Sequence, residues 1–229
     1  MRLARAIART VLAAAALSCR SVGSAPAAPD PAPVPLGEPR PFAALFRLDC
    51  CGQRDLLATV RGDGSVLSVA VAAGPAGTVV EAWLQPQGGF QRDGGERCLQ
   101  PLTGGLLPLA GGTVLPLDPR LAALLLSGVV PRDAHPTAAA SGWFESGVRD
   151  LTVRWRVERG TVTAAEIHRA GDRRLLLAVT MAEHHGRVPG RLSFRAGTDA
   201  GELRLVEWRF VAAPVEPAWL AWRTCGVAP

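Results

Sequence analysis

The sequence of 229 residues contains no lysine, no tyrosine and no asparagine. Without these residues the protein has no lysine for Schiff-base chemistry, no tyrosine acid and no site for N-linked glycosylation. It also lacks the run of about 18 apolar residues that an internal membrane-spanning helix needs. With 48% hydrophobic residues the chain is too apolar for intrinsic disorder, and its length fits one domain with a short appendage.

The chain also carries only a small excess of positive over negative charge. The net charge of +5 includes Arg2, Arg5 and Arg9 in an N-terminal segment that we expect to be removed, and subtracting these three leaves +2. The other arginines alternate with acidic residues instead of forming a block. The composition therefore gives little support to nucleic-acid binding.

Residues 1–19 have the form of a secretory signal peptide: a basic start, a short apolar run and then Ser18 and Cys19. Residues 16–19 resemble a bacterial lipobox, although Ala16 stands where the usual leucine would be. We therefore expect cleavage before Cys19 and acylation of its thiol, which anchors the protein on the periplasmic side of the bacterial outer membrane. The alternative is ordinary cleavage near residues 25–27, which would release a soluble periplasmic protein.

Residues 20–41 are rich in proline and alanine, which predicts an extended tether. The folded domain is predicted to occupy residues 42–229. It contains Cys50, Cys51, Cys98 and Cys225, an even number that indicates two disulfides in an oxidising compartment. Because adjacent cysteines on a strand point to opposite faces, we expect Cys50 and Cys51 to pair with Cys98 and Cys225, with a strained vicinal bridge as the alternative.

Apolar residues alternate with polar ones along most of the folded part, which is typical of antiparallel strands with one solvated face. A phase shift between residues 203 and 210 indicates a β-bulge that bends the sheet. The predicted strands cover residues 56–61, 65–71, 79–84, 97–102, 141–145, 151–157, 161–168, 174–181, 191–195 and 202–211.

One segment, residues 117–128, predicts a short helix. Asp118 can cap it, Pro119 suits its first turn and Gly128 suits its end. Leu121, Leu124 and Leu125 form an apolar stripe, so we expect the helix to lie across a face of the sheet.

The sequence has no catalytic signature. It lacks Gly-x-Ser-x-Gly, His-Glu-x-x-His and nucleotide-binding glycine motifs. Glu183, His184 and His185 have the pattern of a polar turn, and a metal site there would need ligands from elsewhere. We predict that the protein is not an enzyme, and we predict no cofactor and no metal.

Residues 106–120, and the run Leu-Leu-Ser-Gly-Val-Val-Pro at residues 125–131, resemble the LolA/LolB-like lipoprotein carrier and receptor superfamily. Residues 189–192 and 202–210 resemble its closing strands, so the likeness spans about residues 42–214. It implies a mainly β (α+β) fold, in which a curved antiparallel sheet forms an unclosed half-barrel with a short helical lid. The concave apolar face of that sheet would receive acyl chains.

The function that follows is lipoprotein or lipid transport: an envelope lipoprotein binds acyl chains and transfers them to the outer membrane. Its partners would be acylated lipoproteins or lipids, the membrane and other envelope proteins. The acyl-binding candidates are Trp83, Leu121, Leu124 and Leu125, each of which an ordinary packed core would explain equally well. The alternative function is a structural lipoprotein that serves as an accessory subunit of an outer-membrane assembly without transferring lipid.

Overall fold

The structure, a computed structural model, describes residues 33–50, 52–74, 77–103, 106–108, 114–116, 118–138, 141–213 and 216–225. The described residues are mostly β, with one α-helix, α2 (Pro119–Ser127), and one short 3-10 helix, η2 (Ala218–Ala221). The strands are β1 (Leu36–Gly37), β2 (Phe42–Cys50), β3 (Gln53–Gly62), β4 (Leu67–Ala72), β5 (Thr78–Gln85), β6 (Gly88–Asp93), β7 (Gln100–Thr103), β8 (Leu106–Pro108), β9 (Val114–Pro116), β10 (Val130–Pro131), β11 (His135–Pro136), β12 (Trp143–Val148), β13 (Leu151–Glu158), β14 (Thr161–Arg169), β15 (Leu175–Ala182), β16 (Arg191–Ala196) and β17 (Asp199–Phe210).

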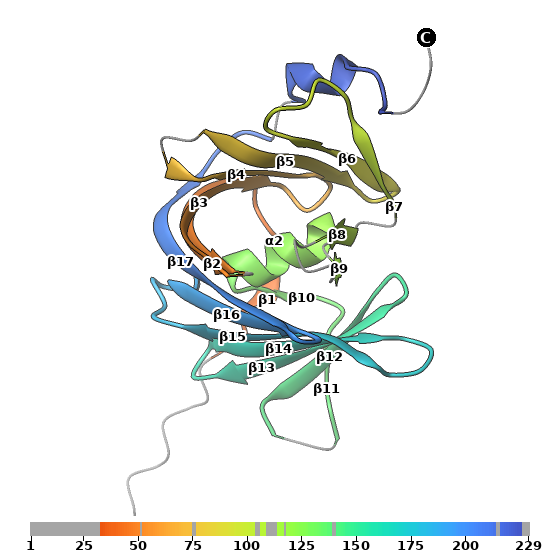
Figure 1. Cartoon of the computed structure of the whole chain (residues 1–229). Helices are drawn as coiled ribbons and strands as arrows, with labels where there is room; N and C mark the ends of the chain where they lie inside the picture. Colours follow the sequence, from red (N-terminus) through yellow and green to blue (C-terminus); the bar gives the residue numbers. More distant parts are fainter. Residues whose placement is uncertain are drawn as a thin grey trace, which may run out of the picture. The chain divides into compact units, whose positions relative to one another are not determined.

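A single 13-stranded antiparallel sheet dominates the fold. Its strand order is β11-β12-β13-β14-β15-β16-β17-β2-β3-β4-β5-β6-β7, so the last long strand joins the N-terminal strands to the later ones. The two ends of this order do not pair with each other, and the sheet curves around α2 (Figure 1). The predicted fold class, an unclosed half-barrel with a short helix, is confirmed.

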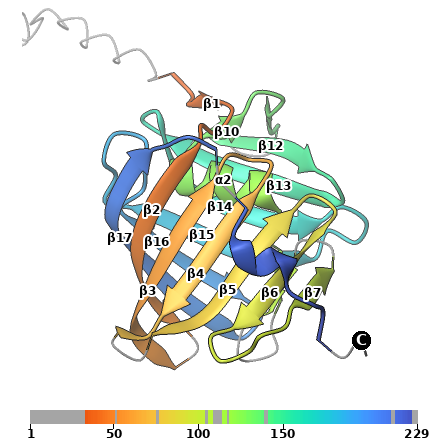
Figure 2. The same cartoon turned by 90° about the horizontal axis from the view of Figure 1, so that it is seen from above.

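Buried and exposed residues alternate along the strands, which gives the sheet one apolar face and one solvated face. In β3 every second residue from Leu56 to Gly62 is buried, and the residues between them are exposed. The concave face therefore carries the apolar set, and the convex face, seen in Figure 2, carries the solvated one.

The predicted bulge lies in β17. Leu205 pairs with Phe46 and Glu207 with Leu45, so Val206 has no opposite residue. Because of this extra residue, the apolar side chains before and after it point to the same face of the sheet, although their spacing in the sequence is irregular. A bulge of this kind also bends the strand.

Two small pairings complete the fold. β1 pairs in parallel with β10, so the last residues of the predicted tether already lie beside the chain that leaves α2. β8 pairs with β9 ahead of the helix. Among the described residues, no helix is long and apolar enough to cross a membrane.

Candidate functional site

The helix α2 forms where the sequence predicts it. Asp118 Oδ1 accepts hydrogen bonds from the backbone N–H groups of Arg120 (2.9 Å) and Leu121 (3.2 Å), and Pro119 follows the cap. At the other end Gly128 is left-handed, with φ of 63°, and its backbone N–H returns to carbonyls of the last turn. A Cβ on Gly128 would lie only 2.0 Å from the carbonyl oxygen of Arg187, so close packing as well as φ requires glycine.

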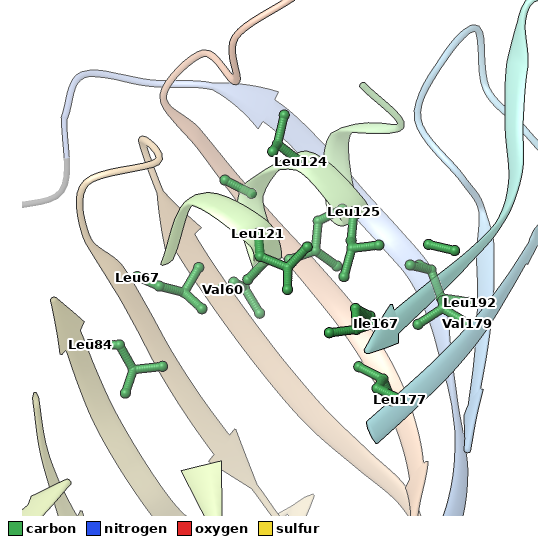
Figure 3. Packing of buried hydrophobic residues seen from close by; sticks show 14 of the residues in the cluster. Val60, Leu67, Leu84, Leu121, Leu124, Leu125, Ile167, Leu177, Val179 and Leu192 are labelled. Atoms are coloured by element: carbon green, nitrogen blue, oxygen red, sulfur yellow. The ribbon is translucent and has the colours of Figure 1, made fainter. Parts of the chain in front are cut away.

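The leucines of α2 are enclosed. Leu121 and Leu124 have no exposed surface and Leu125 has 4%. They belong to one apolar cluster with aliphatic residues from both halves of the sheet. We call the part of the concave face shown in Figure 3 the α2 seat: Val60, Leu67, Leu84, Ile167, Leu177, Val179 and Leu192.

Among the described residues, the ion pairs and side-chain hydrogen bonds that tie α2 to other segments lie at its N-terminal end. Arg149 Nε lies 3.1 Å from the carboxylate of Asp118, and Arg120 lies 3.1 Å from Glu38. Along the helix, the hydroxyl of Ser127 donates to carbonyls of the helix itself. Among the described residues, no hydrogen bond or ion pair joins a side chain of α2 to the α2 seat. Among the residues that the structure describes, α2 therefore contacts the α2 seat through apolar groups alone.

The fourth acyl-binding candidate, Trp83, lies elsewhere. Its neighbours Ala82 and Leu84 belong to the same apolar cluster as the leucines of α2, which lies on the concave face and which we call the concave cluster. Trp83 therefore points to the opposite, convex face of β5. There it packs in a second cluster with Leu99 and Trp219. The expectation that Trp83 lines one site with the three leucines is corrected, because strand alternation separates them. The sequence already indicates this orientation. Residues two apart in a strand share a face, and Trp83 lies two residues from the charged Glu81.

The cover over Trp83 is the C-terminal strap, which we define as residues 216–225 and which includes η2 (Figure 2). The backbone of Leu99 exchanges hydrogen bonds with Arg223 and Cys225. The guanidinium of Arg92 lies 4.9 Å from the ring centroid of Trp222. A disulfide between Cys98 and Cys225 fixes the end of the strap.

This disulfide overturns the predicted pairing. Cys98 and Cys225 bond to each other and not to Cys50 or Cys51. Cys50 is also a disulfide cysteine. Cys51 and the predicted lipid anchor Cys19 lie outside the described residues.

The described residues contain one group whose potential metal-ligand atoms converge, formed by Glu96, Cys98 and Cys225. Both of its sulfur atoms are in the disulfide, so they are not thiolates that could bind a metal. Of the predicted polar turn, His184 Nε2 lies 2.8 Å from the carbonyl oxygen of Val162, an ordinary structural contact.

Comparisons with known proteins show a distant likeness of fold. No family model matches the chain, and no curated protein matches it. Among solved structures it is similar to a LolA superfamily protein from Nitrosomonas europaea, with 12% identity and a TM-score of 0.47, over 77% of this chain and 88% of that one. At that level the likeness is a distant relation of fold and carries no inference about function.

Proposed function

We propose that the protein is an envelope lipoprotein that binds acyl chains of lipoproteins or lipids against the α2 seat and delivers them to the outer membrane. The observation that carries the proposal is the apolar contact between α2 and the α2 seat on the concave face of an unclosed sheet. Apolar contact has no directional partner, so an aliphatic chain can replace the leucines without leaving a polar group unsatisfied.

The magnitudes allow this exchange. Burial of one leucine side chain contributes about 1.5 to 3 kcal/mol, and α2 buries four of them: Leu121, Leu124, Leu125 and Leu126. A fully buried acyl chain of about 15 methylenes contributes about 12 kcal/mol at about 0.8 kcal/mol each. One chain therefore matches the helix, and a ligand with two or three chains exceeds it. The transfer needs no covalent catalyst, so the proposal includes no enzymatic step.

The envelope location rests on the sequence of the N-terminus and on chemistry. Cys19 would carry the lipid anchor on the periplasmic side of the outer membrane. The Cys98–Cys225 disulfide is consistent with an oxidising compartment, because cytosolic thiols are kept reduced.

One observation favours the second candidate, an accessory subunit with a permanently filled core. Leu121 and Leu124 are completely buried, as they would be if α2 never left its seat. The two candidates differ in whether a lipid can displace the helix.

The deciding experiment uses the full chain produced in an oxidising periplasm. Native mass spectrometry before and after addition of dipalmitoyl phosphatidylglycerol or a triacylated cysteine peptide measures binding. Hydrogen exchange then reports the site: bound lipid should speed exchange of the α2 amides and leave the C-terminal strap unchanged as an internal control. A protein that binds neither probe would refute the proposed lipid binding and leave the accessory subunit as the remaining candidate. Binding with unchanged exchange in α2 would place the lipid outside the α2 seat.

A further inference from the structure

The end of β17 forms an aromatic rim on the concave face. β16 pairs with β17 only from Asp199 to Arg204, whereas β2 pairs with it as far as Phe210. Past the bulge, Trp208 and Phe210 lie opposite Ala44 and Phe42, which belong to the concave cluster. We call Phe42, Trp208 and Phe210 the β17 rim.

The rim is apolar and partly open to solvent. The rings of Phe42 and Trp208 are stacked with centroids 4.6 Å apart, and Phe210 meets Trp208 edge-on at 6.4 Å. Phe42 is completely buried, but Phe210 is 63% exposed, the most of any large apolar side chain among the described residues. Arg40 lies 5.9 Å from the Phe210 ring centroid. The rim thus runs from the buried core to the surface beside a cation.

The indole Nε1–H of Trp208 is enclosed and has no hydrogen-bond acceptor among the described residues. In contrast, the indole Nε1–H of Trp155 donates to Ser146 Oγ at 3.0 Å. A buried donor without an acceptor is costly, and a ligand oxygen that reaches it gains a hydrogen bond. Trp83 has a similar unpartnered indole, but it lies under the C-terminal strap on the other face.

We propose that the β17 rim is the mouth of the acyl site, where the indole N–H of Trp208 donates to the carbonyl that heads the acyl chain. This inference rests on the proposed function. Trp208 packs against the same cluster as the leucines of α2, so a chain in the α2 seat continues to the rim without crossing a polar layer. The exposed ring of Phe210 covers the first methylenes. The ligand class is an acyl ester or amide, as in a phospholipid or an acylated cysteine.

The test compares two probes that differ only in the carbonyl: dipalmitoyl phosphatidylglycerol and its dihexadecyl diether analogue. The full-length chain should bind the diester about two- to twelvefold more tightly, the range expected for one neutral hydrogen bond. Trp208→Phe keeps an aromatic ring on Phe42 and removes the donor. It should lower the diester affinity to that of the diether and leave the diether affinity unchanged. Trp222→Phe, the same change on the C-terminal strap, should keep the preference.

A second variant covers the case in which Trp208→Phe unfolds the chain, which circular dichroism would reveal. Phe210→Ala removes a largely exposed ring and should weaken both probes equally. Equal affinity of the parent chain for diester and diether would refute carbonyl recognition at the β17 rim, but it would not contradict the proposed function. Failure of both probes to bind would instead overturn the proposed function. A diacylglyceryl cysteine peptide and its dialkyl analogue repeat the comparison, and the larger preference identifies the ligand source.

Discussion

Loosening α2 should make the protein less stable but a better lipid binder. Asp118→Ala removes the cap that accepts the N–H groups of Arg120 and Leu121 and also breaks the ion pair with Arg149. A lost N-cap costs about 1 kcal/mol, and a partly exposed ion pair adds at most about 1 kcal/mol. The free energy of unfolding should therefore fall by about 1 to 2 kcal/mol. Urea unfolding measures this change.

If an acyl chain must displace α2, part of its binding free energy is spent on detaching the helix. In the Asp118→Ala variant this cost is lower by the free energy that the cap and the ion pair contributed. The dissociation constant for dipalmitoyl phosphatidylglycerol should therefore fall by about five- to thirtyfold in the Asp118→Ala variant. Native mass spectrometry titration measures the affinity of both proteins.

Asp63→Ala is the matched control. Asp63 Oδ1 accepts the backbone N–H groups of Ser65 (2.8 Å) and Val66 (2.9 Å) in the hairpin between β3 and β4, a similar side-chain cap that does not belong to α2. This variant should lose stability with no gain in affinity. If Asp118→Ala also leaves the affinity unchanged, or lowers it, displacement of α2 is refuted.

Three further predictions concern stability. Replacing both Cys98 and Cys225 by serine opens a loop with a sequence separation of 127 residues and should cost about 4 to 5 kcal/mol in urea unfolding. Burial raises the pKa of Asp63, but hydrogen bonds from the Ser65 hydroxyl and backbone outweigh it and lower the pKa. The advantage of the parent chain over Asp63→Asn should therefore exist above pH of about 4 and vanish as pH falls through the folded-state pKa. Trp155→Phe should cost about 1 to 3 kcal/mol because the buried Ser146 hydroxyl loses its partner, and adding Ser146→Ala should recover part of that loss.

Local signals were sufficient for the helix and for most strands. The cap, the proline and the left-handed glycine of α2 act within one or two turns, so the sequence determines its bounds to within two residues. The bulge at Val206 is predicted by the broken alternation of apolar residues between 203 and 210. β2 was missed because its first residues are buried on both faces, so apolar residues follow one another without alternation.

The disulfide pairing was unreadable because it depends on strand order. Cys50 ends β2, whereas Cys98 lies just before β7, five strands away in the sheet. At about 4.8 Å per strand, these positions are about 24 Å apart, far beyond the reach of one disulfide. Only the return of the chain end to the outer face of β5 and β6 brings Cys225 to Cys98. No local pattern encodes that return.

Displacement of α2 and recognition of the carbonyl by Trp208 are two separate contributions to the affinity for the ligand. A double variant tests whether they are independent. Asp118 holds the helix that occupies the seat, so its replacement should strengthen binding of every acyl probe. Trp208 reads only the carbonyl, so its replacement should weaken the diester alone. If the two act separately, Asp118→Ala with Trp208→Phe should bind the diether as tightly as Asp118→Ala does and should bind the diester no better than the diether. A diester preference that survives in the double variant would mean that the carbonyl is recognised by a group uncovered when α2 leaves, and not by the rim.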